Sequence, residues 1–228
     1  MKKKNALRLR SVGMSSLLFA ALLSLVFFAA CSTAPKTNPS TATANAGGPV
    51  TAWEAKAQIV NRESQRSRNM AIDFVAVDHS QLRIDVMGTF GTPVAAAVLR
   101  GEKLTYLLPR QKRFYQGPAL SSSLKPLIGF DLEPREIFSI LYGEALQGSD
   151  WTCHRELSSS LCTNAQKAVS IQSAAQVGQR RKVQITGTKL SLQLDLERIP
   201  PKDFNPTKAF SLNIPADYSL IKSQTATK

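Results

Sequence analysis

The sequence is poor in the residues that usually carry out chemistry. It contains two histidines and three cysteines in 228 residues. It has no G-x-S-x-G, H-E-x-x-H or P-loop pattern. His79 and His154 lie in expected turns, and neither has a second histidine at a metal-binding spacing. Asp131 and Glu133 precede an expected helix, where capping is the ordinary role of a carboxylate. We therefore expect no enzyme, no metal ion and no cofactor.

Acidic residues are absent from positions 1–30, and the whole chain has a formal charge of +13. A nucleic-acid-binding protein usually gathers its charge on one patch or helix. Here only Arg180-Arg181-Lys182 forms a basic run, which we interpret as a solvated turn. Contact of that run with anionic lipid or phosphate stays open, and no nucleic-acid partner is expected.

The sequence has no apolar run long enough for an ordinary membrane span. The run Leu17–Ala30 has 14 residues, whereas a spanning helix needs about 20. It follows a basic start and ends in small residues, which is typical of a secretory signal peptide. Residues 1–30 are therefore predicted to be a cleaved signal peptide.

The end of that run, Phe28-Ala29-Ala30-Cys31, resembles the lipobox of bacterial lipoproteins. The resemblance implies cleavage before Cys31 and covalent attachment of diacylglyceryl and N-acyl chains to it. Three acyl chains form a stable anchor, whereas one binds marginally. Ser32, rather than Asp, implies the outer membrane of the bacterial envelope, with the protein facing the periplasm. The alternative is an ordinary signal peptide followed by a chance cysteine.

The remaining residues divide into a linker, a domain and a tail. Residues 31–50 are small, polar and rich in Pro and Gly, so we expect a disordered linker after the acylated cysteine. Residues 51–222 are expected to fold as one domain, and residues 223–228 as a tail.

Two cysteines lie within the expected domain. Cys153 and Cys162 flank a short polar segment that is typical of a hairpin loop. Export places them in an oxidising compartment, so we predict a disulfide between them. A metal or redox pair is the alternative, and their spacing is not the C-x-x-C of such sites.

Most of the domain alternates between apolar and polar residues, which predicts half-buried antiparallel strands. The alternation recurs in 70–76, 82–86, 104–108, 190–196 and 210–214. Ser121-Ser122-Ser123 is expected to cap a short helix that ends at Gly129. Glu133-Pro134 is expected to begin a second, ending at Gly143. The fold class is thus mainly β with short α: a curved antiparallel sheet, or unclosed β-barrel, of about ten strands lidded by short helices.

Four segments resemble the LolA/LolB family of outer-membrane lipoprotein localisation proteins. Residues 82–93 are LRIDVMGTFGTP, residues 104–117 are LTYLLPRQKRFYQG, residues 127–143 are LIGFDLEPREIFSILYG, and residues 209–221 are AFSLNIPADYSLI. The resemblance implies an unclosed barrel around an apolar cavity that holds acyl chains. It also implies that a protruding apolar residue, matched here by Phe90 in the loop with Gly88 and Gly91, acts on the membrane. The alternative for Phe90 is burial in the core.

The apolar strand and helix positions are candidates for lining such a cavity, and an ordinary filled core is the alternative for each. These positions are Ile72, Phe74, Leu82, Ile84, Val86, Leu104, Tyr106, Ile137, Ile140 and Leu141.

The leading functional hypothesis is an outer-membrane-anchored lipoprotein that binds acyl chains and helps to insert lipoproteins into the outer membrane. Its expected partners are membrane lipid, acylated lipoproteins and a periplasmic LolA-like carrier. The alternative is an envelope structural or assembly lipoprotein that uses the same fold to dock another envelope protein.

Overall fold

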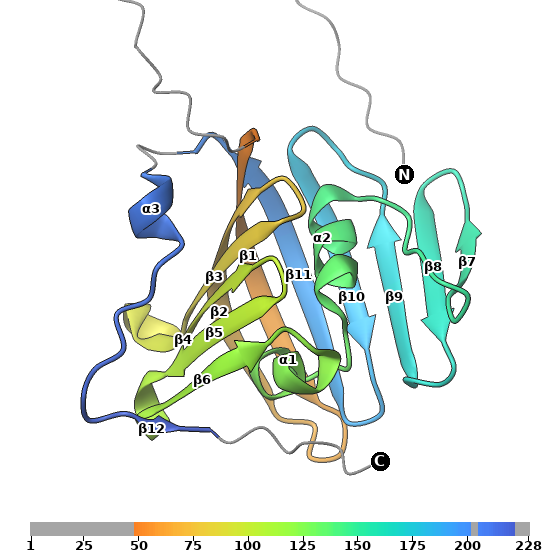
Figure 1. Ribbon diagram of the computed structural model, residues 1–228. Coiled ribbons are helices and arrows are strands. Elements are labelled where there is room, and N and C mark those ends of the chain that lie inside the picture. Colours follow the sequence, from red (N-terminus) through yellow and green to blue (C-terminus); the bar gives the residue numbers. More distant parts are fainter. Residues whose placement is uncertain (1–47, 202–204, 222–228) are drawn as a thin grey trace, which may run out of the picture. The chain divides into compact units, whose positions relative to one another are not determined.

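The computed structural model describes residues 48–201 and 205–221 (Figure 1). The predicted signal peptide, Cys31, nearly all of the predicted linker and the predicted tail lie outside the described residues. Those assignments, and the domain boundaries built on them, stay predictions. The first strand begins at Val50, one residue before the expected start of the domain.

The described residues form one twelve-stranded sheet, which confirms the predicted fold class with two strands more than expected. Its order is β12-β6-β5-β4-β3-β2-β1-β11-β10-β9-β8-β7. Every neighbouring pair is antiparallel except β12 and β6. The strands are β1 (Val50–Asn61), β2 (Ser67–Val77), β3 (Gln81–Met87), β4 (Pro93–Arg100), β5 (Lys103–Leu108), β6 (Arg113–Pro118), β7 (Thr152–Arg155), β8 (Ser159–Asn164), β9 (Val169–Ala174), β10 (Arg180–Thr186), β11 (Leu190–Ile199) and β12 (Ser219–Leu220).

Apolar and polar residues alternate along the strands, so the concave face of the sheet is mainly buried and the outer face is more exposed. In β1, Trp53, Ala55 and Ala57 are buried, whereas Glu54 and Lys56 are exposed. Because successive side chains of a strand point to opposite faces, the same parity continues into neighbouring strands through the register. One large cluster of buried apolar residues therefore covers the concave face from β1 to β6 and from β9 to β11.

Two of the three α-helices cover this face, as Figure 1 shows for α1 (Ser121–Ile128) and α2 (Pro134–Tyr142). Both were predicted with their ends, and Gly129 and Gly143 close them with φ of 83° and 76°. These left-handed angles suit glycine, which has no Cβ to clash. The side chains of Glu133 and Glu136 form the capping box of α2.

The predicted serine cap of α1 is wrong. The N-cap position is Leu120, which makes no capping bond through its side chain. Ser123 is instead buried, with its Oγ 2.9 Å from the hydroxyl of Tyr115. A serine inside the first turn thus meets a polar partner on β6, so the helix start depends on packing more than on a cap.

The strand predicted over residues 210–214 is also wrong. After α3 (Pro206–Ala209), this segment crosses the outer face of the sheet as irregular chain. Phe210 is buried there against Val77 and Val98. Arg83 donates hydrogen bonds to the main-chain carbonyls of Ala209 and Ser211. The apolar alternation of this segment therefore reflects contact with the outer face, and pairing with β6 begins only at Ser219.

The basic run Arg180-Arg181-Lys182 begins β10 and is not a turn. Arg180 and Lys182 point to the outer face, where Arg180 forms an ion pair with Glu197 at 2.6 Å. Arg181 shares the parity of the buried Val183 and Ile185, and so points to the concave face.

A disulfide joins Cys153 of β7 to Cys162 of β8, which are also cross-strand partners. In the chain-entropy account, a bond that closes a ring of about ten residues stabilises by roughly 2–3 kcal/mol. We expect the Cys153→Ser/Cys162→Ser double variant to lose about that much free energy of unfolding in urea denaturation. An unchanged free energy would show that this edge hairpin frays independently of the sheet.

Candidate functional site

Phe90 lies in the turn between β3 and β4 and is 98% exposed. The turn is a short 3-10 segment, η1 (Thr89–Gly91), in which Phe90 has a left-handed φ of 62°. The N–H of Gly88 donates to the carbonyl of Thr92 at 2.8 Å, and the hydroxyl of Thr92 donates to the carbonyl of Thr89 at 3.0 Å. These local bonds hold the ring out in solvent, although a phenylalanine is ordinarily buried.

Gly91 continues the same left-handed conformation, with φ of 70° and no other atom within 4 Å of an added Cβ. A side chain at this position would therefore be strained by the backbone alone. Two successive left-handed residues turn the chain sharply and place Phe90 at the tip.

All ten residues predicted to line a cavity are buried in the large core cluster. Their rings and methyl groups contact one another and the helices. The cavity role stays a prediction, and in this structure these residues form packed core.

Small residues on the strands leave space that the two-helix layer fills. Ala55, Ala57, Ala95 and Ala97 are buried on the concave face. Large side chains of residues 129–142 lie in the same cluster, namely Phe130, Leu132, Ile137, Phe138, Ile140 and Leu141. We define α1, α2 and their connection as the helix layer, residues 121–142. The layer contributes apolar groups where a ligand in a hollow barrel would lie.

The first turn of α2 is held by a buried carboxylate. Glu136 is 2% exposed and accepts hydrogen bonds from Trp151 Nε1 at 2.6 Å and from Lys167 Nζ at 2.9 Å. Lys167 belongs to the turn between β8 and β9. A buried charge is tolerated when paired and hydrogen-bonded, so this ion pair fixes the beginning of the helix against the sheet.

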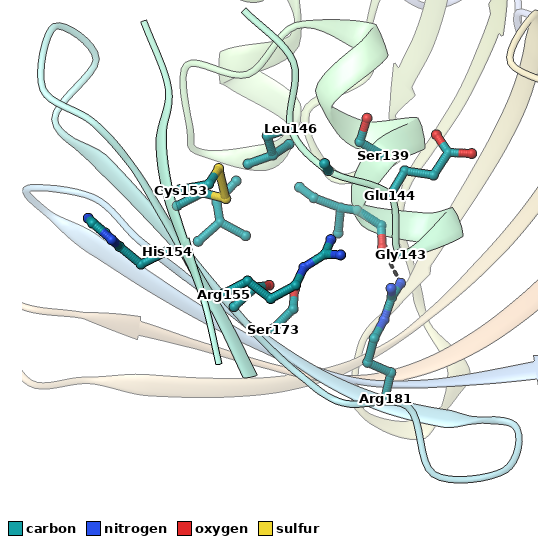
Figure 2. Close-up of a pocket in the computed structure, with 14 residues that line it drawn as sticks. Ser139, Gly143, Glu144, Leu146, Cys153, His154, Arg155, Ser173 and Arg181 are labelled. Atoms are coloured by element: carbon teal, nitrogen blue, oxygen red, sulfur yellow. Dashed lines mark hydrogen bonds between the residues drawn. A yellow bond between two sulfur atoms is a disulfide. The ribbon is translucent and has the colours of Figure 1, made fainter. Parts of the chain in front are cut away.

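The last turn of α2 is held by a buried cation. Arg181 of β10 donates from one terminal nitrogen to the carbonyls of Ile140 and Leu141. Figure 2 draws Arg181 beside the end of the helix. Burial lowers the pKa of Arg181 from its ordinary value. A cation stabilises the C-terminal end of a helix, where carbonyls have no intrahelical partner. The Nε of Arg181 is buried without a hydrogen-bond partner among the described residues.

Aromatic contacts also attach the C-terminal end of α2 to the sheet. Tyr142 donates its hydroxyl proton to the carbonyl of Asp78 at 2.9 Å, and burial raises the pKa of Tyr142. Its ring packs edge-on against Trp53 with centroids 5.1 Å apart. His79 Nε2 lies 2.9 Å from a carboxylate oxygen of Glu144 just beyond the helix.

A cavity of about 60 Å³ lies beside this end of α2 (Figure 2). Arg155, Ser160 and Ser173 line it and are successive cross-strand partners on β7, β8 and β9. Its volume suits a few water molecules and is far too small for an acyl chain. Ile140 and Ile171 of the core cluster also line it, so the lining mixes polar and apolar side chains.

Glu136 and Arg181 are the residues that sequence reasoning missed. The parity of Arg181 with Val183 and Ile185 would have placed it on the dry face, once residues 180–186 were assigned to a strand. Glu136 gave no comparable signal, because a glutamate three residues after a helix start is ordinary in a capping box.

Among residues 48–201 and 205–221, no group of three or more His, Cys, Asp and Glu side chains could hold a metal ion. Within the same ranges, no helix is both long and apolar enough to cross a membrane.

No family model matches the chain, and no curated protein matches it. Solved structures that it resembles include a LolA superfamily protein from Nitrosomonas europaea, with 8% identity and a TM-score of 0.41. That match covers 72% of this chain and 90% of the other. A structure from Vibrio parahaemolyticus, described as a putative outer membrane lipoprotein-sorting protein domain, has 9% identity and a TM-score of 0.39, with 70% and 88% covered. A conserved protein from Thermus thermophilus has 9% identity and a TM-score of 0.35, with 75% and 90% covered.

The Arg181→Met variant tests the attachment of α2. It leaves the carbonyls of Ile140 and Leu141 without their charged donor, which we expect to cost about 2 kcal/mol of unfolding free energy. Amide exchange should accelerate in 134–142 more than in the central strands. The matched control is Arg180→Met, whose side chain is exposed and pairs on the outer face. Equal effects of the two substitutions would contradict the assignment.

Proposed function

We propose that this protein is a lipid-anchored envelope protein that binds acyl chains under its helix layer and helps to insert lipoproteins into the outer membrane. The observation that carries the proposal is the exposed Phe90, fixed by its turn beside a sheet whose apolar concave face is closed by two short helices. The driving force is apolar burial, and no covalent step is needed.

Acyl binding requires the helix layer to move, because its side chains fill the space. A chain of about fifteen methylenes gains roughly 12 kcal/mol on full burial, at about 0.8 kcal/mol per methylene. The polar bonds that hold α2 contribute about 1–3 kcal/mol each. Part of the helix layer can remain packed against the bound chain. Each large side chain of the layer that becomes exposed loses roughly 1.5–3 kcal/mol, so the exchange favours the acyl chain only if Phe138 and most of its neighbours stay packed against it.

Phe90 is proposed to contact the bilayer during delivery. Full burial of a phenylalanine side chain contributes about 1.5–3 kcal/mol, which suits a transient contact better than an anchor. The anchor itself is proposed to be the acylated Cys31 in the outer membrane. The proposed partners are membrane lipid, an acylated lipoprotein and a periplasmic carrier similar to LolA. These assignments rest on the sequence resemblance.

A second candidate is an envelope assembly lipoprotein that docks a protein partner. The packed interior favours it, because the ten candidate cavity residues already have apolar neighbours. The two candidates differ in one property: only the first requires uptake of an acyl chain.

Native mass spectrometry of the mature chain, offered a triacylated peptide and the same peptide without acyl chains, separates them. Acyl transfer predicts a one-to-one complex with the acylated peptide alone. A chain that ignores both peptides would support the docking candidate and contradict the first.

The Phe90→Glu variant tests the loop. The side chain has no packing to lose, so stability should stay within about 0.5 kcal/mol of the parent. Delivery of an acylated lipoprotein to vesicles should fall about tenfold, because a carboxylate resists entry into a bilayer. The control is Thr92→Ser, which keeps the turn's hydroxyl. Unchanged delivery by Phe90→Glu would remove the loop from the mechanism.

A further inference from the structure

Two further exposed apolar side chains lie far from Phe90 in the fold. Leu157, between β7 and β8, is fully exposed at 106%, and Val177, between β9 and β10, is 79% exposed. The N–H of Ala175 donates to the carbonyl of Ser158 at 2.7 Å, which joins the two turns side by side. We call Leu157, Val177 and these two turns the apolar tip.

The apolar tip lies at the edge of the sheet where the chain first enters it. The N–H of Arg198 donates to the carbonyl of Gln179, and Arg198 is the cross-strand partner of Trp53 near the start of β1. Neighbouring strands are about 4.8 Å apart, so the turn with Val177 lies about two strands, or roughly 10 Å, from the start of β1. Figure 1 shows both turns and the start of β1 along its upper edge, with the turn that carries Phe90 at the lower left.

Register places Phe90 at the other end of β3. That strand has seven residues and spans about 23 Å. It begins beside the turn that follows β2, whose last residue, Val77, pairs with Val50. One end of the sheet therefore carries Phe90, and the end where the chain enters carries the apolar tip.

The number of residues between Cys31 and Gly48 indicates which surface lies near the apolar tip. Gly48 follows Cys31 by 17 positions in the sequence. A linker of the predicted composition and that length has an r.m.s. span of about 20–25 Å. A bilayer that holds Cys31 therefore lies close to this end of the domain.

We propose that the apolar tip rests in the interface of the membrane that anchors the chain, with Leu157 and Val177 among the headgroups and upper acyl chains. The proposal rests on the proposed function only for the anchor at Cys31. In the resting orientation Phe90 faces away from that membrane, where it is accessible to an incoming lipoprotein or its carrier. Contact of Phe90 with the same bilayer then requires the domain to turn over on its linker.

The test uses the mature, acylated chain in vesicles of phosphatidylethanolamine and phosphatidylglycerol that contain a brominated phosphatidylcholine. Leu157→Trp and Val177→Trp place a fluorophore at each turn, and Glu63→Trp, in the exposed turn between β1 and β2, is the matched control. The native Trp53 is buried and Trp151 is half-buried. Thermal unfolding of each variant shows that the fold is retained.

The proposal predicts that bromine quenches the new tryptophan at 157 and 177 about twofold, because interfacial side chains lie roughly 5–10 Å into the headgroup and acyl boundary. The tryptophan at 63 should be unaffected. Flotation of the vesicles shows whether the protein is bound to them. If the protein floats with the vesicles but neither 157 nor 177 is quenched, the proposed contact is wrong and the proposed function stands. If the vesicles float without the protein, the lipid anchor is wrong and both proposals fail.

Discussion

The rest of this structure depends on one constraint: the apolar face of the sheet must be shielded from water. The sheet is too wide to stay flat and does not close, so its concave face needs a cover. Alternating residues make that face continuous from β6 to β9, and the small side chains of β1 and β4 deepen it. The helix layer is the cover. Its large side chains, such as Phe138, occupy the space that the alanines leave.

Two buried charges make this cover specific. Apolar contact alone would let a short helix slide on the sheet, since dispersion and burial are not directional. Glu136 fixes the first turn of α2 through Lys167 and Trp151, and Arg181 fixes the last turn through two carbonyls. Each bond joins the helix to a segment distant in sequence. The layer is therefore positioned at both ends of α2, and its middle contributes only apolar surface.

This arrangement also separates the places where we propose that lipid acts. Phe90 and the apolar tip lie at different ends of the sheet, and the helix layer lies over its concave face. A domain with apolar contacts at two ends can be held at one membrane while it presents the other end to a partner. The strand lengths set the distance between them, so the separation follows directly from the register.

Much of the architecture could be predicted because it depends on local patterns. Alternation marked most of the strands, and Gly129 and Gly143 marked the ends of two helices. Apolar and polar residues alternate just as clearly from Phe210 to Ile214, yet this segment crosses the outer face. An apolar pattern shows that side chains are buried, but it does not show which surface buries them. Ser123 was expected in a cap and lies against Tyr115, a contact between two elements. Arg181 was placed in a turn because three basic residues in a row usually lie in solvent, and only strand parity shows that the middle one is buried.

Hydrogen–deuterium exchange of the mature chain, with and without a triacylated peptide, tests the central claim most directly. If acyl chains bind under the helix layer, amides in 121–128 and 134–142 should exchange at least about tenfold faster with the peptide, while β1 and β2 keep their protection. The peptide without acyl chains should change nothing. Unchanged exchange in both helices, in a sample where the acylated peptide is bound, would show that the layer does not open and would contradict the account.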